Sequence, residues 1–308
     1  PVYRFPVLVA GLSFLFFMLG PKGHAQNGRW LLLETNCRNF GEAVALQRQL
    51  TAEKQWVAII SKPEEILVFS DRAVYDLKRT FPAIKGTASG DSDLSSFYLA
   101  LTSGQLSKIS NDYTPAAGTT CVQHALEPRN DPQVYPPPIP DLNSETARGV
   151  VVASALFIES DGSRDKNYYS WTQKALDQEK QTILRALTVW SYTAAQYGEA
   201  LTFIPDWNYR KPEMDQGLEP NIRFGSFDFY TGDLIDMSQT VLRKSLNKSE
   251  QDYFFSLGHQ WNDFQKRLHQ ADGAFTMAVH YSHQGRGYIR AQAFIGGPGT
   301  FFAGGTRF

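Results

Sequence analysis

The chain has 308 residues, of which 42% are hydrophobic and 13% aromatic, so its composition is that of a packed globular protein and excludes an intrinsically disordered one. Its formal net charge is −1, with 30 basic and 31 acidic residues, so no large basic field recommends a nucleic acid as a partner. The length is sufficient for two domains.

The start of the chain has the three parts of a secretory signal peptide. Arg4 supplies the positive charge, residues 7–19 form an apolar stretch, and Gly23-His24-Ala25 is a small-x-small cleavage site. The apolar stretch is too short to cross a hydrocarbon core, which needs about 20 residues, and no other segment is long and apolar enough. We therefore expect residues 1–25 to be a signal peptide, the protein to be secreted (extracellular or periplasmic), and the mature chain to have no membrane span.

Residues 26–126 are predicted to form a small α+β domain. Short apolar runs indicate strands at 30–33, 56–60 and 66–69, and helical spacing of apolar residues indicates a helix over 41–54. This part of the sequence contains no catalytic constellation. Its position after a signal peptide is typical of a pro-segment or of a binding module.

The chain contains two cysteines, Cys37 and Cys121. In an exported domain such a pair is more typical of a disulfide than of a metal site, because His124 alone does not complete a set of zinc ligands. Two unrelated thiols are the alternative.

Residues 127–148 are predicted to be a linker. They contain six prolines, Pro128, Pro132, Pro136, Pro137, Pro138 and Pro140. Closely spaced prolines favour an extended polyproline II path, which makes a semi-rigid spacer. The second domain then begins at residue 149 and runs to residue 308.

The second domain opens with a nearly continuous apolar run over 150–158, typical of a central strand that is buried on both faces. A capping box formed by Ser170 and Gln173 predicts the start of a long amphipathic helix over 172–197, which Gly198 is placed to end. The next strand is expected at 200–204, stopped by Pro205.

A second amphipathic helix is predicted over 249–270, with Gly273 placed to end it, followed by strands at 275–281 and 288–295. The fold class expected from these elements is α+β or α/β. The C-terminal domain is expected to hold a twisted mixed sheet of about four strands with two long helices, in which strands joined by a long helix run parallel.

The order of these elements resembles the upstream half of a secreted bacterial zinc metallopeptidase of the metzincin type. The resemblance covers residues 149–299 and rests on the order and spacing of four short pieces: 155–162, 190–192, 201–203 and 293–298. It implies peptide-bond hydrolysis, zinc as the cofactor of the full-length parent, and an extended peptide or protein as the substrate.

The same resemblance implies a substrate-binding strand over 288–295. In such enzymes the strand before the zinc helix lines the cleft and pairs with the substrate through its backbone. The residues so implicated are Tyr288, Arg290, Gln292 and Phe294. A simple edge strand is the alternative.

The motif that performs zinc chemistry in that family, H-E-x-x-H on the next helix, does not occur in this sequence. The six histidines are scattered, and His280 and His283 would point to opposite faces of a strand. We therefore expect no metal site and no cofactor for residues 1–308, with the histidines on the surface, and the sequence leaves the catalytic residues unknown.

Three readings follow from these observations. The chain is a fragment of a longer enzyme, a degenerate relative that lost the metal, or a secreted non-catalytic binding or adhesion protein. A first residue that is Pro1, and a last residue, Phe308, that comes before the expected zinc helix, favour the first reading.

Overall fold

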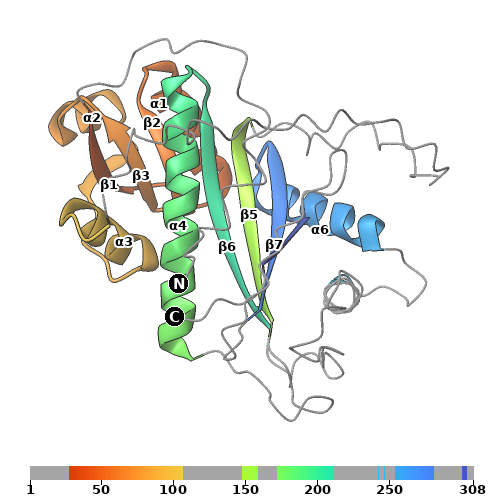
Figure 1. The fold of residues 1–308 in the computed structure, drawn as a ribbon. Helices are drawn as coiled ribbons and strands as arrows, with labels where there is room; N and C mark the ends of the chain where they lie inside the picture. Colours follow the sequence, from red (N-terminus) through yellow and green to blue (C-terminus); the bar gives the residue numbers. More distant parts are fainter. Residues whose placement is uncertain are drawn as a thin grey trace, which may run out of the picture.

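The computed structural model describes residues 28–106, 148–158, 172–210, 254–280 and 300–303, together with the single positions 242 and 246. Within these residues the fold is α+β, built on one mixed sheet of eight strands in the order β4-β1-β3-β2-β6-β5-β7-β8 (Figure 1). The predicted fold class is confirmed. The predicted signal peptide, the Pro-rich linker and the strand at 288–295 lie outside the described residues.

The first part of the chain supplies one half of the sheet and three helices. Its elements are β1 (Arg29–Thr35), α1 (Phe40–Ala52), β2 (Trp56–Lys62), β3 (Glu65–Ser70), α2 (Val74–Thr80), β4 (Ile84–Thr87) and α3 (Asp93–Thr102). Strand β1 runs antiparallel to β3 and β4, and β2 runs antiparallel to β3. The strands and the helix predicted between residues 30 and 69 are all confirmed.

The second part supplies the parallel half of the sheet. Its elements are β5 (Gly149–Ile158), α4 (Gln173–Gln196), β6 (Leu201–Arg210), α6 (Phe254–His269), β7 (Gly273–His280) and β8 (Thr300–Ala303). Strand β5 runs parallel to β6 and β7, and β7 runs parallel to β8. The parallel arrangement predicted for strands joined by a long helix is confirmed. Among the described helices, none has both the length and the apolarity required of a membrane span.

The two halves form a single sheet because β2 pairs in parallel with β6, with Ile59 opposite Phe203. Three of the four strands expected for a separate C-terminal sheet therefore belong, as β5, β6 and β7, to a larger one, and the fourth, at 288–295, lies outside the described residues. The sequence on either side of the Pro-rich segment contains no indication of this pairing, since each side has a set of strands and helices of its own.

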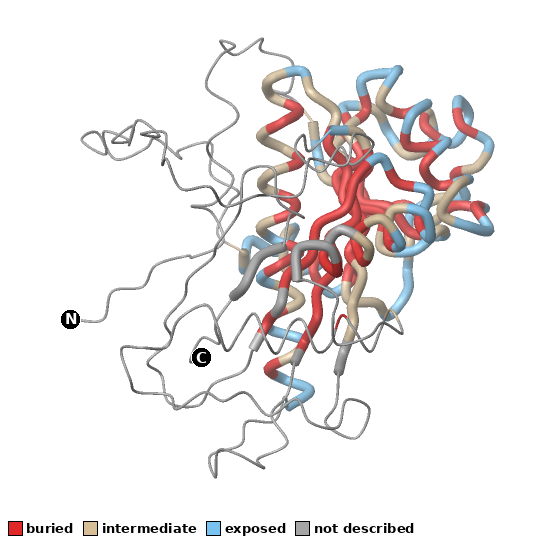
Figure 2. Tube along the Cα trace, turned by 90° about the vertical axis from the view of Figure 1, so that its right-hand side faces the viewer, coloured by how far each residue is buried: buried red, intermediate tan, exposed pale blue. Residues whose placement is uncertain are grey.

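Helices cover both faces of the sheet. Helices α1, α2 and α6 pack on one face, where Val150, Val152 and Ile204 join the apolar residues of α1. Helices α3 and α4 pack on the other face, where α4 covers the odd-numbered residues of β5 from Val151 to Phe157. Buried residues accordingly run through the strands and along the inner sides of the helices (Figure 2). Strand β5 is buried on both faces, as its apolar run predicted.

The helix ends differ in part from the sequence expectations. Helix α4 is capped by Thr172, whose side chain accepts a hydrogen bond from the Ala175 N–H, so the predicted capping box at Ser170 is wrong. Gly198 does end this helix, with φ of 79°. Helix α6 ends at His269, and Gln270 takes the left-handed conformation with φ of 52°. The assignment of that role to Gly273 was wrong.

Pro205 does not stop strand β6, which continues to Arg210. Strand β2 pairs with β6 at Phe203 only, so one side of β6 carries no hydrogen-bond ladder at Pro205 in the described part of the sheet. A proline is tolerated at such an edge because its missing N–H would have had no partner there. The expectation that Pro205 ends the strand was therefore wrong.

Gly149 supplies a first test of the fold. Its φ is +67°, and a Cβ atom built on it would lie 2.2 Å from Oδ2 of Asp272, the oxygen that accepts the Val150 N–H. We expect Gly149→Ala to lower the free energy of unfolding by about 1–3 kcal/mol from backbone strain alone. The matched control is Gly86→Ala in β4, where the added carbon meets open space. Equal urea midpoints for the two variants would contradict this account.

Candidate functional site

The carboxyl ends of the parallel strands form the candidate site region. In parallel sheets the strands end at the same edge, and ligands bind in the crevice outside these ends. Here β2, β6, β5, β7 and β8 all run in one direction, so all five strands end at this edge, which we call the carboxyl edge. Three polar features lie along the strands and helices that lead to it: two clusters of side chains and one isolated carboxyl group.

The first set surrounds Ser154 on the face covered by α6. Ser154 is fully buried; its hydroxyl donates to Oδ2 of Asp206 at 3.1 Å and accepts from Nδ2 of Asn208 and Nε1 of Trp261, each at 3.2 Å. Asn208 also donates to the same Asp206 oxygen. The Ser154 hydroxyl is therefore saturated, which is the state of a structural group and not of an activated nucleophile.

This set continues across the sheet as a polar row. Asp206 and Thr276 are the cross-strand neighbours of Ser154 on β6 and β7. The Thr276 hydroxyl donates to Oδ1 of Asn262 at 2.6 Å, and both residues are buried. Together with Trp261, these bonds fix α6 against β5 and β7. One buried acceptor close by in sequence, Oε1 of Gln265, has no hydrogen-bond partner among the described residues.

The second polar feature is Glu179 on α4, on the opposite face of the sheet. Ala175 and Ile183 lie one helical turn to either side of it, and both belong to the apolar cluster beneath α4. Glu179 is only 8% exposed, and this burial raises the pKa of its carboxyl from 4.5 to about 7. A carboxyl that titrates near neutral pH is suited to donate or accept a proton.

Glu179 takes no part in the ion pair that the adjacent residue, Lys180, forms. The ammonium of Lys180 lies 3.0 Å from Oδ2 of Asp93 on α3 and 5.9 Å from the centre of the Trp207 ring. Lys180 thus points toward α3, whereas the cause of the raised pKa of Glu179 is desolvation. Two adjacent charged residues of α4 consequently have different surroundings.

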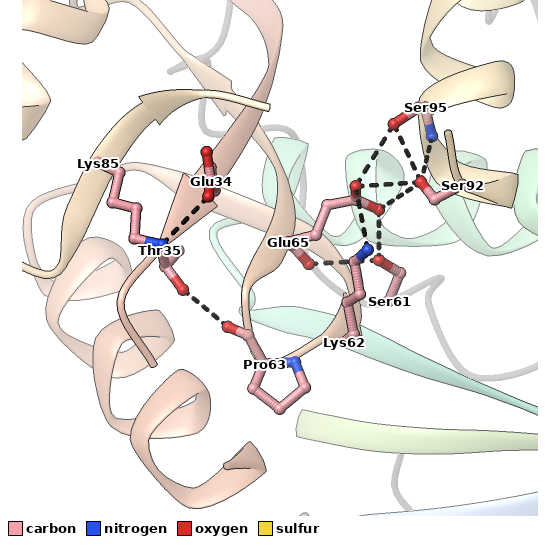
Figure 3. A network of polar contacts seen from close by, with 9 residues as sticks. All are labelled: Glu34, Thr35, Ser61, Lys62, Pro63, Glu65, Lys85, Ser92 and Ser95. Atoms are coloured by element: carbon pink, nitrogen blue, oxygen red, sulfur yellow. Dashed lines mark hydrogen bonds and ion pairs between the residues drawn. The ribbon is translucent and has the colours of Figure 1, made fainter. Parts of the chain in front are cut away.

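The third set surrounds Glu65, where the turn after β2 leads into β3 (Figure 3). Its carboxylate is 3% exposed and accepts hydrogen bonds from Ser61 and Ser92, both at 2.8 Å, with Ser95 at 3.4 Å and the Lys62 ammonium at 3.9 Å. Ser92 is also the N-cap of α3, because its side chain accepts the Ser95 N–H. The buried carboxylate therefore ties the β2–β3 turn to the first turn of α3.

Most of the residues predicted from sequence to form a site lie outside the described residues. This holds for the substrate-binding set Tyr288, Arg290, Gln292 and Phe294, and for Cys121. Cys37 is buried and forms no disulfide with another described residue. The disulfide between Cys37 and Cys121 stays a prediction.

One histidine departs from the expectation of a surface position. His269 is 5% exposed; its Nδ1 lies 3.0 Å from the Gln265 carbonyl oxygen, and its ring packs edge-on against Phe40 of α1. The expectation was wrong for His269 because the ring fills the contact between α6 and α1. Among the described residues, no three His, Cys, Asp or Glu side chains lie close enough together to hold a metal ion.

Neither Glu179 nor the row around Ser154 was predicted from the sequence. The signal for Glu179 was available, because a charged residue stands four positions from both Ala175 and Ile183 within an apolar stripe. The row has a weaker signal, a single serine within the apolar run of β5. Its partners on β6, β7 and α6 depend on strand register, which the sequence does not give.

Comparison of the chain with protein-family models, with curated proteins and with solved structures found no match. The residues and their geometry therefore carry the functional argument alone.

The raised pKa of Glu179 predicts that the free energy of unfolding depends on pH. Because its pKa is higher in the folded protein, the folded state loses stability as the pH rises from 4.5 to about 7, by about 3 kcal/mol in total. We expect Glu179→Gln to remove most of this loss, so that the variant is the more stable protein at pH 8 and close to the unmodified protein below pH 4.5. Urea unfolding across this range measures it, with Glu64→Gln on the surface as control. A parallel pH profile for Glu179→Gln and the unmodified protein would refute the assignment.

The hydrogen bonds to Glu65 predict that its replacement lowers the stability of the fold. Glu65→Ala leaves the hydroxyls of Ser61 and Ser92 without their buried acceptor, which is expected to lower the free energy of unfolding by about 1–3 kcal/mol. The adjacent Glu64 is exposed, so Glu64→Ala is expected to change it by less than about 0.5 kcal/mol. Chemical denaturation of both variants measures the difference, and similar values for the two would disprove the role given to Glu65.

Proposed function

We propose that residues 149–308 form the upstream part of a secreted zinc-dependent endopeptidase-like domain of the metzincin type, without its zinc-binding helix. The observation that carries the proposal is the order β5, α4, β6, α6, β7, β8, with β6, β5, β7 and β8 parallel and adjacent. The sequence resemblance implies the order from β5 to β7; the strand that it implies next, at 288–295, lies outside the described residues, and β8 was not predicted. In this proposal the chain carries the scaffold of a peptidase and lacks its hydrolytic centre.

The proposal assigns a role to the segment between β7 and β8. These strands are parallel neighbours in the sheet, and β7 ends at His280 whereas β8 begins at Thr300. We propose that residues 288–295 present their backbone groups to an extended peptide, with Tyr288, Arg290, Gln292 and Phe294 contacting its side chains. Main-chain pairing of this kind accepts many sequences, and the side chains would set the preference.

The described residues of this chain do not fit a catalytic zinc ion. Such an ion takes three protein ligands and keeps one position open for water. The described His269 is buried against Phe40, and the sequence contains no H-E-x-x-H. Zinc is therefore proposed for the full-length parent alone, and no catalytic step is assigned to residues 1–308.

A secreted non-catalytic binding or adhesion protein is the second candidate. It is favoured by the saturation of two buried polar groups: the hydrogen bonds of Ser154 and Glu65 hold α6 and α3 in place. Such groups stabilise a scaffold and leave binding to its surface.

Zinc content and proteolysis test the proposal. The secreted chain is dialysed against zinc, its metal content is measured, and its hydrolysis of casein is followed with and without a chelator. We expect less than one zinc ion per chain and no chelator-sensitive hydrolysis, because three ligands on a rigid scaffold are lacking.

Two results would count against this reading. One zinc ion per chain that is lost in His280→Ala and His283→Ala would show a metal site built from the residues present, and chelator-sensitive hydrolysis would show a complete catalytic centre. The encoding transcript separates the two candidates: an H-E-x-x-H motif encoded after Phe308 supports the peptidase, and a stop codon directly there supports the binding protein.

A further inference from the structure

We infer that residues 28–106, the N-terminal unit, are a permanent partner of the parallel strands and not a pro-segment that is released from them. The C-terminal unit, defined by the described residues from 148 onward, offers an interaction surface made of the β6 edge and the adjoining sides of α4, α6 and β7. The partner that fits this surface is the β2 edge with α1 and α3. A cut in the Pro-rich segment would therefore leave one two-chain protein.

The first argument is that both units contribute to the same apolar cores. On one face of the sheet, Leu33, Val57 and Ile60 share a buried cluster with residues of the C-terminal unit, namely Val150, Val152, Ile204 and Ala274. On the other face, Ile59, Leu94 and Phe97 share a cluster with Leu184, against which Trp207 packs. An interface built like a domain core cut in half is typical of obligate association.

The second argument is a pair of buried hydrogen bonds across the junction. The Thr202 hydroxyl on β6 donates to the Val57 carbonyl oxygen at 2.6 Å and accepts from Nε2 of Gln47 at 3.0 Å. Thr202 and Gln47 are 1% and 3% exposed. Because both of these buried side chains have hydrogen-bond partners on the other unit, the junction has the character of a protein interior.

The third argument is that charged contacts fix the junction at both of its sides. Arg48 of α1 lies 2.9 Å from Asp272, whose other oxygen accepts the Val150 N–H. On the opposite face, Lys180 pairs with Asp93 at the start of α3. Exposed ion pairs contribute little energy singly, but these two constrain the relative position of the units.

Release of the N-terminal unit would uncover a surface that cannot face water. Strand β6 would become a free edge between two apolar faces, and β5 next to it is buried on both faces. Removal of a pro-segment is expected to activate the domain that it covers, but removal of the N-terminal unit would destabilise that domain. The inference does not depend on whether that domain is a peptidase.

The test is a cleavable full-length chain. A protease recognition site is placed within residues 130–140, so that Cys37 and Cys121 remain on the same piece and a disulfide between them cannot hold the two pieces together. After complete cutting, we expect both pieces to elute together in size-exclusion chromatography at the position of the uncut chain. Elution of two separate folded pieces in native buffer would overturn the inference, and so would the loss of one piece while the other stays folded.

Two variants of α1 show whether the described surface holds the pieces together. In the cut protein, Gln47→Ala is expected to weaken association about tenfold, because it removes the buried partner of Thr202. Gln49→Ala, at an exposed position of the same helix, is the matched control and is expected to have no effect. Association is measured as the dependence of co-elution on protein concentration at a fixed urea concentration. Equal behaviour of the two variants would mean that another surface joins the pieces.

Discussion

The parallel contact between β2 and β6 is the interaction on which the rest of the structure depends. Without it the antiparallel strands β4-β1-β3-β2 and the parallel strands β6-β5-β7-β8 would be two small sheets. The contact also explains the position of α4, whose consecutive residues Ile183 and Leu184 belong to two different apolar clusters, one under each half of the sheet. A single helix thus covers the junction, and its length of 24 residues matches that role.

The buried carboxyl groups illustrate two ways in which the fold accommodates charge. Glu65 receives hydroxyl donors from the turn after β2 and from the first turn of α3, so its desolvation is offset by hydrogen bonds. Glu179 is surrounded by the apolar stripe of α4, and its carboxyl responds with a pKa near 7. The first arrangement stabilises the structure, whereas the second lowers its stability as the pH rises from 4.5 to about 7. Uncompensated burial of this kind is found more often at functional positions than elsewhere, which directs attention to the face of the sheet under α4.

The sequence predicted the separate elements well and their connection poorly. The apolar run of β5 and the amphipathic stripe of α4 are local patterns, so both elements were placed within one or two residues. The junction was missed because the hydrogen bond from Thr202 to Val57 joins residues 145 positions apart, and no local pattern encodes that distance. Pro205 and His269 were misassigned for a related reason: the first is tolerated at an edge, and the second fills a contact between two helices. Both depend on neighbours that only the tertiary structure supplies.

The mixed sheet also has a consequence for the order in which the protein folds. The antiparallel half consists of strands that follow one another closely in sequence. The loops that have to close before these strands pair are therefore short, which favours rapid pairing. This half also leaves the ribosome first, with the outer edge of β2 still unpaired. When β6 is synthesised, the residues of that edge have already been made, so the parallel strands can then add to it one after another. The N-terminal unit would in this way act as the nucleus on which the slower parallel half assembles.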